Sequence, residues 1–85
     1  MLTVNHELLN AICCYTSLSK VKVYEKLDLN KYFNFSYFCR ITGIEGYPTP
    51  ENIEVIQKAL DESFTITELS GIATIQNTLM KRKRS

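Results

Sequence analysis

The chain has few of the residues that mark disulfide-bonded or metal-binding proteins. It contains three cysteines and one histidine among its 85 residues. Cys13 and Cys14 are adjacent, and an odd, partly adjacent set is a poor framework for structural disulfides. His6 has no recognised metal-ligand spacing to the cysteines, so we expect a surface or helix-start histidine and no metal site. The cysteines are predicted to be reduced, buried thiols of a cytoplasmic protein.

Long apolar runs, a charged leader and a strong net charge are also missing. No apolar stretch approaches the length that spans a membrane, and no charged-then-apolar leader opens the sequence. The formal net charge is +1, which argues against a histone-like protein that binds nucleic acid through bulk charge. A Gly-rich phosphate loop and a nucleophile paired with a base are absent. The sequence therefore predicts no enzyme and no cofactor.

What is present is the composition of one small globular domain. Hydrophobic residues make up 45% of the chain and charged residues 22%, which are ordinary values. A chain of this length is near the lower limit for a self-sufficient core, so dimerisation would help. We predict an all-α domain over residues 1–85, a small bundle of about five short helices. The expected helices cover about residues 5–15, 19–27, 34–41, 50–60 and 65 onward.

Helix-start signals support three of these segments. Thr49 followed by Pro50 combines an N-cap with the residue that best suits the first helical position. Ser19 is a further N-cap candidate, and the run 65–68, Thr-Ile-Thr-Glu, matches the capping box. Gly71 costs about 1 kcal/mol inside a helix. The last helix is therefore expected to be weakest, and could break, at that position.

Two segments leave a β-strand open as an alternative. The alternation Val-Lys-Val-Tyr at residues 21–24 suits a strand as well as a helix. Residues 32–38 hold five aromatic side chains, more than one small core face can bury. Part of this cluster should line the core and part should face a partner. A hydrophobic hairpin strand is the alternative for this segment.

Several segments, taken in order, resemble the Cro/C1 (XRE-type, lambda-repressor-like) helix-turn-helix regulators. Residues 18–30, Leu-Ser-Lys-Val-Lys-Val-Tyr-Glu-Lys-Leu-Asp-Leu-Asn, resemble the second helix and turn of that family. Residues 37–41, Tyr-Phe-Cys-Arg-Ile, look like the end of its recognition helix. Residues 47–53, Tyr-Pro-Thr-Pro-Glu-Asn-Ile, and 56–60, Ile-Gln-Lys-Ala-Leu, are similar to the stretch that opens and fills its fourth helix. Residues 64–69 resemble its short fifth helix.

The resemblance covers about residues 5–70 and leaves 71–85 as a C-terminal segment with a basic tail. It implies a small sequence-specific DNA-binding regulator, repressor-like or antitoxin-like, that binds double-stranded operator DNA as a homodimer. Asn34 would cap the recognition helix, and Arg40 would reach a guanine edge or a phosphate. The other implied contacts are Ser36 and Tyr37 to bases or phosphates, Phe35 to a thymine methyl, Ser19 and Lys20 to the backbone, and Lys22 and Lys31 to further phosphates.

Each of these residues also has an ordinary structural explanation. The lysines would form a solvated helix face, Phe35 and Tyr37 would belong to the core, and Arg40 would form a salt bridge. Residues 72–80 are the expected dimer surface, with packing against the first helix as the alternative. The basic run 81–84 would be either an arm that contacts phosphates or a solubilising terminus.

The sequence departs from the family at four places. Tyr24 stands where a small residue is usual, and Asp28 stands where Gly is common. Residues 29–34 contain about four residues more than a compact turn requires, and the Gly that follows the recognition helix is displaced to Gly43 and Gly46. The lengthened turn, the near-neutral charge and the surplus aromatics favour an alternative function. That alternative is a helical protein–protein adaptor or inhibitor, anti-repressor or chaperone-like, that does not bind DNA.

Overall fold

The computed structural model describes residues 3–44 and 46–82, and every regular element in them is helical. The elements are α1 (His6–Thr16), α2 (Lys20–Lys26), the short 3₁₀ helix η1 (Leu29–Lys31), α3 (Phe35–Ile41), α4 (Pro50–Ser63) and α5 (Ile66–Arg82). The predicted all-α class is confirmed. Residues 21–24 lie inside α2, and within the described ranges no strand forms over 32–38.

The helices begin where local side-chain chemistry predicts that they begin. In each of the first four α-helices the N-cap side chain accepts a hydrogen bond from a free backbone N–H: Asn5 from Leu8, Ser19 from Lys22, Asn34 from Tyr37 and Thr49 from Asn52. At α5, the Thr65 N–H donates to Glu68 Oε1 at 2.9 Å and the Glu68 N–H donates to Thr65 Oγ1 at 3.2 Å. The capping box predicted there is confirmed.

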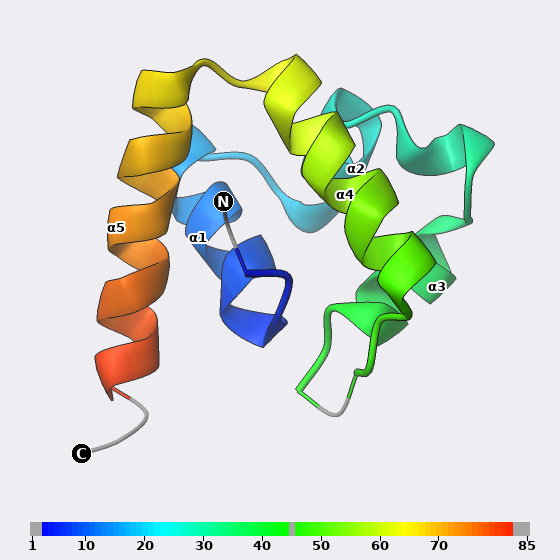
Figure 1. The fold of residues 1–85 in the computed structure, drawn as a ribbon, viewed down its shortest axis with the longest axis horizontal. Helices are drawn as coiled ribbons and strands as arrows, with labels where there is room; N and C mark the ends of the chain where they lie inside the picture. The colour runs from blue at the N-terminus through cyan, green and yellow to red at the C-terminus, as the bar shows by residue number, and fades with distance from the viewer. Residues whose placement is uncertain (1–2, 45, 83–85) are drawn as a thin grey trace.

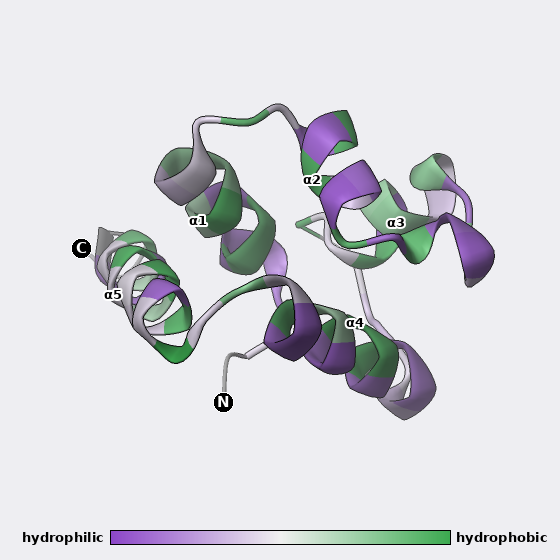
Figure 2. Cartoon of the chain, turned by 90° about the horizontal axis from the view of Figure 1, so that it is seen from above, coloured by the Kyte–Doolittle hydropathy of each residue, from purple (hydrophilic) through white to green (hydrophobic). Residues whose placement is uncertain are grey.

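The helices form two groups with α4 lying over one of them. At one end α1 and α5 lie side by side, and at the other end α4 lies in front of α2 and α3 (Figure 1). Seen from above, α4 shows both hydrophilic and hydrophobic residues along its length (Figure 2), as an amphipathic helix over a core should. The largest buried side chains of that core are Phe38, Leu8, Ile12, Leu29, Ile56, Leu60, Ile72 and Val23.

The last helix does not break at Gly71, contrary to the weakness expected there. A methyl group placed on Gly71 would lie 2.6 Å from Cε1 of Tyr15. The missing side chain therefore makes room for an aromatic ring that comes from α1. The next residue, Ile72, is fully buried, and this packing outweighs a local cost of about 1 kcal/mol.

The inward side of residues 72–80 packs against α1. Gln76 is 3% exposed, and its Nε2 donates to the Thr3 carbonyl at 2.7 Å and to Asn5 Oδ1 at 2.9 Å. Packing against the first helix, the alternative to a dimer surface, therefore accounts for this side of the segment. In the basic run 81–84, Lys81 is exposed, while residues 83 and 84 lie outside the described residues.

The connection between α2 and α3 explains the departures from the compact helix-turn-helix pattern. Asp28 has a left-handed φ of 53°, a conformation that Asp tolerates better than most residues and that Gly adopts freely. The extra residues form η1, in which Leu29 is fully buried. Tyr24 is also buried, and its hydroxyl donates to the Phe33 carbonyl at 2.6 Å. A large side chain at this position therefore holds the longer turn in place.

Candidate nucleic-acid interface around α3

The helix α3 has one buried face and one exposed face. Phe38 and Ile41 are buried in the core. Ser36, Tyr37 and Arg40 are exposed, and their i, i+1, i+4 spacing puts them on one side of the helix. The structure therefore brings three of the predicted contact residues together on an uncovered surface.

Tyr37 is fixed in place by the start of α4. The Asn52 Nδ2 amide donates to the Tyr37 hydroxyl at 2.9 Å, and the Tyr37 ring lies 5.7 Å from the Phe33 ring. A phenol oxygen that accepts one hydrogen bond still has its own hydrogen to donate. Tyr37, 38% exposed, therefore presents an oriented donor beside Ser36.

Phe35 is held by the protein rather than presented to a partner. Its ring makes an edge-on contact with the Tyr24 ring at a centroid distance of 5.5 Å, and its side chain is half-buried against the core. The core explanation therefore accounts for this residue. The predicted cap, Asn34, accepts a hydrogen bond from the Tyr37 N–H at 2.8 Å, which fixes the first turn of α3.

Arg40 is the cation of the exposed face of α3. It is exposed in the last turn of the helix, and within residues 3–44 and 46–82 it forms no ion pair. The salt bridge considered as its ordinary explanation is therefore not observed in the described residues. The helix itself, Phe-Ser-Tyr-Phe-Cys-Arg-Ile, carries no carboxylate, so Arg40 is the one charged side chain of α3.

Lys22 and Lys31 are each paired with a neighbouring carboxylate. The Lys22 Nζ lies 3.6 Å from Glu25 Oε1, and the Lys31 Nζ lies 3.2 Å from Asp28 Oδ2. The hydrogen bond and the charge of Asp28 raise the pKa of Lys31. Both pairs are exposed to solvent, and such pairs contribute little to stability. A phosphate could therefore replace either carboxylate at small cost.

Ser19 and Lys20 lie at the opposite end of α2 from η1. The Ser19 hydroxyl accepts from the Lys22 N–H at 3.4 Å, so its first role is to cap the helix. Lys20 is close enough to α1 to act on Cys13: burial raises the pKa of that thiol, and the Lys20 charge partly opposes the rise. All three cysteines are free, but the expectation that they are buried is wrong: Cys14 is exposed, and Cys13 and Cys39 are half-buried.

The predicted residues thus form separate groups along α4 rather than one patch. Tyr37 meets the N-terminal turn of α4 at Asn52. Lys31 instead lines a small cavity with Lys58 and Glu62, near the C-terminal end of α4. Asn52 and Glu62 are ten residues apart on α4, or about 15 Å at 1.5 Å per residue, and the cavity begins at Val55, about one turn from Asn52. Arg40, Tyr37 and Ser36 form the compact part of the candidate interface.

Sequence reasoning missed exposed apolar residues outside the predicted set. Ile44 is 74% exposed and Tyr47 is 89% exposed, both on the loop that follows α3. Tyr32, beside η1, is 53% exposed. Neither Ile44 nor Tyr47 belongs to a periodic hydrophobic pattern, so the sequence does not tell whether their side chains are buried or exposed.

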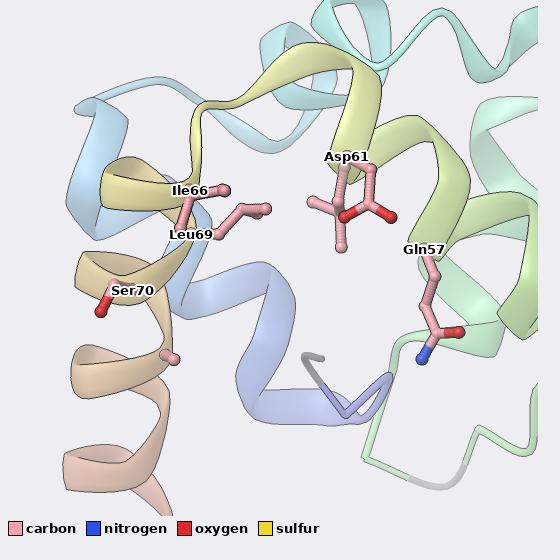
Figure 3. A pocket seen from close by; sticks show the side chains of 7 residues that line it. Gln57, Asp61, Ile66, Leu69 and Ser70 are labelled. Atoms are coloured by element: carbon pink, nitrogen blue, oxygen red, sulfur yellow. The ribbon is translucent and has the colours of Figure 1, made fainter.

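A groove between α4 and α5 was also missed. It has a volume of about 300 Å³ and is lined by Gln57, Leu60, Asp61, Ile66, Leu69, Ser70 and Ala73. Ile66 and Leu69 point from α5 toward the gap, with Asp61 and Gln57 on the α4 side (Figure 3). Ile66, Leu69 and Ala73 recur at i, i+3 and i+7, and this shared helix face was the available signal.

The small net charge hides a strong segregation of charge along the chain. Residues 19–41, which include α2, η1 and α3, contain five Lys or Arg and two Asp or Glu, a formal charge of +3. Residues 50–63, which form α4, contain one Lys and four Asp or Glu, a formal charge of −3. The α2–α3 segment is therefore basic although the protein as a whole is nearly neutral.

The described residues hold neither a metal site nor a membrane-spanning helix. Among residues 3–44 and 46–82, no three His, Cys, Asp or Glu side chains are grouped so that they could hold a metal ion. No helix in those ranges is both long and apolar enough to cross a bilayer. Compared with family models, curated proteins and solved structures, the chain matches none of them.

Proposed function

We propose that the protein is a small sequence-specific DNA-binding transcriptional regulator, not an enzyme, in which α2 and α3 serve as a helix-turn-helix and α3 enters the major groove. It would act in the cytoplasm, as a homodimer, by occupying an operator and blocking or recruiting polymerase. The observation that carries the proposal is the exposed face of α3, where Ser36, Tyr37 and Arg40 lie together in a segment with a formal charge of +3.

The chemistry of this face suits base-edge contacts. An Arg side chain can donate two hydrogen bonds to guanine O6 and N7, and hydroxyl groups can donate to or accept from base edges. The Tyr37 hydroxyl is oriented by Asn52, so little side-chain freedom remains to be lost on binding. The lysines of α2 and η1 would add phosphate contacts, which position the protein but carry no sequence information.

The test starts from a duplex library of random sequence, because the operator is unknown. Selected duplexes would then be compared with scrambled ones by fluorescence anisotropy, at about 0.05 M and 0.2 M salt. The key variant is Arg40→Ala, and the matched control is Lys58→Ala. Each removes one exposed cation, but Lys58 lies on α4, away from the exposed face of α3.

Arg40→Ala should weaken binding to the selected duplex about tenfold or more, because one bidentate base contact is worth about 1–3 kcal/mol. The ratio of the affinities for the selected and the scrambled duplex should fall. Lys58→Ala should change both affinities by less than about twofold. Equal losses for the two variants would indicate bulk electrostatic attraction and contradict the proposal. Failure to enrich any sequence at low salt would also contradict it.

A protein–protein adaptor is the second candidate function. It is favoured by two exposed apolar side chains on the loop that follows α3, Ile44 and Tyr47, because exposed apolar groups close together mark interaction surfaces. Replacing Tyr47 by Ser would impair such an adaptor while leaving a DNA regulator nearly unchanged. Pull-down with this variant, in parallel with Arg40→Ala, therefore separates the two functions.

A further inference from the structure

The groove between α4 and α5 carries an unburied apolar side chain on its own wall. Ile66 is 87% exposed, although burying an Ile side chain is worth about 1.5–3 kcal/mol. Leu60, Leu69 and Ala73 give the groove the apolar lining that such a side chain would fill. A projecting side chain and a matching hollow therefore lie next to each other on one face of the molecule.

We propose that this face joins two copies of the chain about a two-fold axis. A two-fold contact uses the same patch on both copies, so a projection fits a hollow twice. If two α5 helices cross antiparallel with the axis between Leu69 and Ser70, Ile66 lies opposite the partner's Ala73, and Leu69 lies opposite the partner's Ser70. Each pair sets a large apolar side chain against a small residue, as close packing requires.

The charges along this face select the antiparallel orientation. Asp61 and Glu62 are exposed at the corner where α4 leads into α5, and Lys81 is exposed at the far end of α5. The helix has 17 residues, or about 25 Å at 1.5 Å per residue. A parallel pair would place two Lys81 ends together. An antiparallel pair moves each Lys81 toward the acidic corner of the other copy.

Cations of the same chain also lie near this corner. The Lys26 Nζ lies 5.2 Å from the ring centroid of Phe64, and Glu62 lines the second cavity together with Lys31 and Lys58. Asp61 lines the groove itself and is the carboxylate that faces the contact. The attraction between Asp61 and Lys81 of the other copy should weaken when salt screens the charges.

This contact deepens the proposed function, on which its biological use rests, because it names the surface that makes a paired regulator. It places the contact on the α4–α5 side, whereas α3 lies at the other end of the domain (Figure 1). The exposed face of α3 would therefore stay open on both copies. The sequence predicts a dimer surface at residues 72–80, whereas the proposed contact uses the groove around Ile66.

The experiment is sedimentation equilibrium of the full chain and two single variants, Ile66→Glu and Ile44→Glu. Ile66 begins α5, where a carboxylate is favourable to the helix, so folding should be kept, as circular dichroism would verify. Ile44 is 74% exposed on a distant loop and receives the same chemical change. Wild type should dimerise, Ile66→Glu should weaken the dimer about tenfold or more, and Ile44→Glu should change it less than about twofold.

Several results would overturn the inference. These are a wild-type chain that stays monomeric up to about 1 mM, an Ile66→Glu variant that dimerises like wild type, and an Ile44→Glu variant that loses as much as Ile66→Glu. The outcome is separable from that of the DNA experiment. A dimer that binds no DNA contradicts the proposed DNA binding and leaves the two-fold contact standing. A monomer that binds DNA contradicts the two-fold contact and the homodimer, and leaves the proposed DNA binding standing.

Discussion

Tyr24→Phe should destabilise the protein by about 1–2 kcal/mol, although it removes a single oxygen atom. The Tyr24 side chain is 8% exposed, and its hydroxyl donates to the Phe33 carbonyl at 2.6 Å. A typical intramolecular hydrogen bond contributes about 0.5–1.5 kcal/mol net, and a carbonyl left without its partner adds to the loss. The ring remains in place between Phe35 and Phe38, so packing should be unchanged.

Urea denaturation followed by circular dichroism measures this loss as a change in the free energy of unfolding, with an unchanged slope against urea. The melting temperature should fall by about 4–8 °C for each kcal/mol, as is usual for a domain of 60–100 residues. Tyr32→Phe is the matched control, because Tyr32 is 53% exposed and its change should stay within about 0.5 kcal/mol. Equal stabilities of the two variants would refute the role given to the Tyr24 hydroxyl in holding the α2–α3 connection.

Three further predictions concern the glycines and the cysteines. Gly46→Ala should destabilise the protein by about 1–3 kcal/mol, because a methyl group would lie 2.4–2.7 Å from backbone atoms in the last turn of α3. Gly43→Ala should cost less, and urea denaturation of both variants tests the difference. Gly71→Ala should be about 1 kcal/mol more favourable in a Tyr15→Ala background than in wild type, and a double-mutant cycle that shows no coupling would contradict the close approach of ring and helix. Iodoacetamide should alkylate exposed Cys14 before half-buried Cys13, since the raised pKa of Cys13 leaves less thiolate at neutral pH; tandem mass spectrometry distinguishes the two sites, and the gap in rate should shrink as the pH rises.

Helix starts could be predicted from the sequence because they depend on neighbouring residues. Ser19, Thr49 and Thr65 each bond to a backbone N–H within a few residues, so the chemistry that defines the cap is readable in a short window. The same holds for the exposed face of α3, which follows from helical spacing alone. By contrast, α4 runs to Ser63, about a turn beyond the predicted end.

The remaining features depend on residues far apart in the chain. Gly71 looks like a helix breaker until Tyr15, on α1, is placed over it. The hydrogen bond that orients Tyr37 comes from Asn52, 15 residues later. The groove around Ile66 exists because α4 and α5 diverge from their corner. No local pattern records these contacts, since each depends on how whole helices are arranged.

The pairing of α1 with α5 has a consequence for synthesis of the protein in the cell. Gln76 bonds to Thr3 and Asn5, across 73 and 71 residues, and α5 covers the apolar side of α1. Until α5 has left the ribosome, Leu8 and Ile12 lack the surface that buries them. Contacts of such long sequence separation form slowly, so the first helix of the emerging chain is expected to stay open to chaperones until α5 has been made and has packed against it.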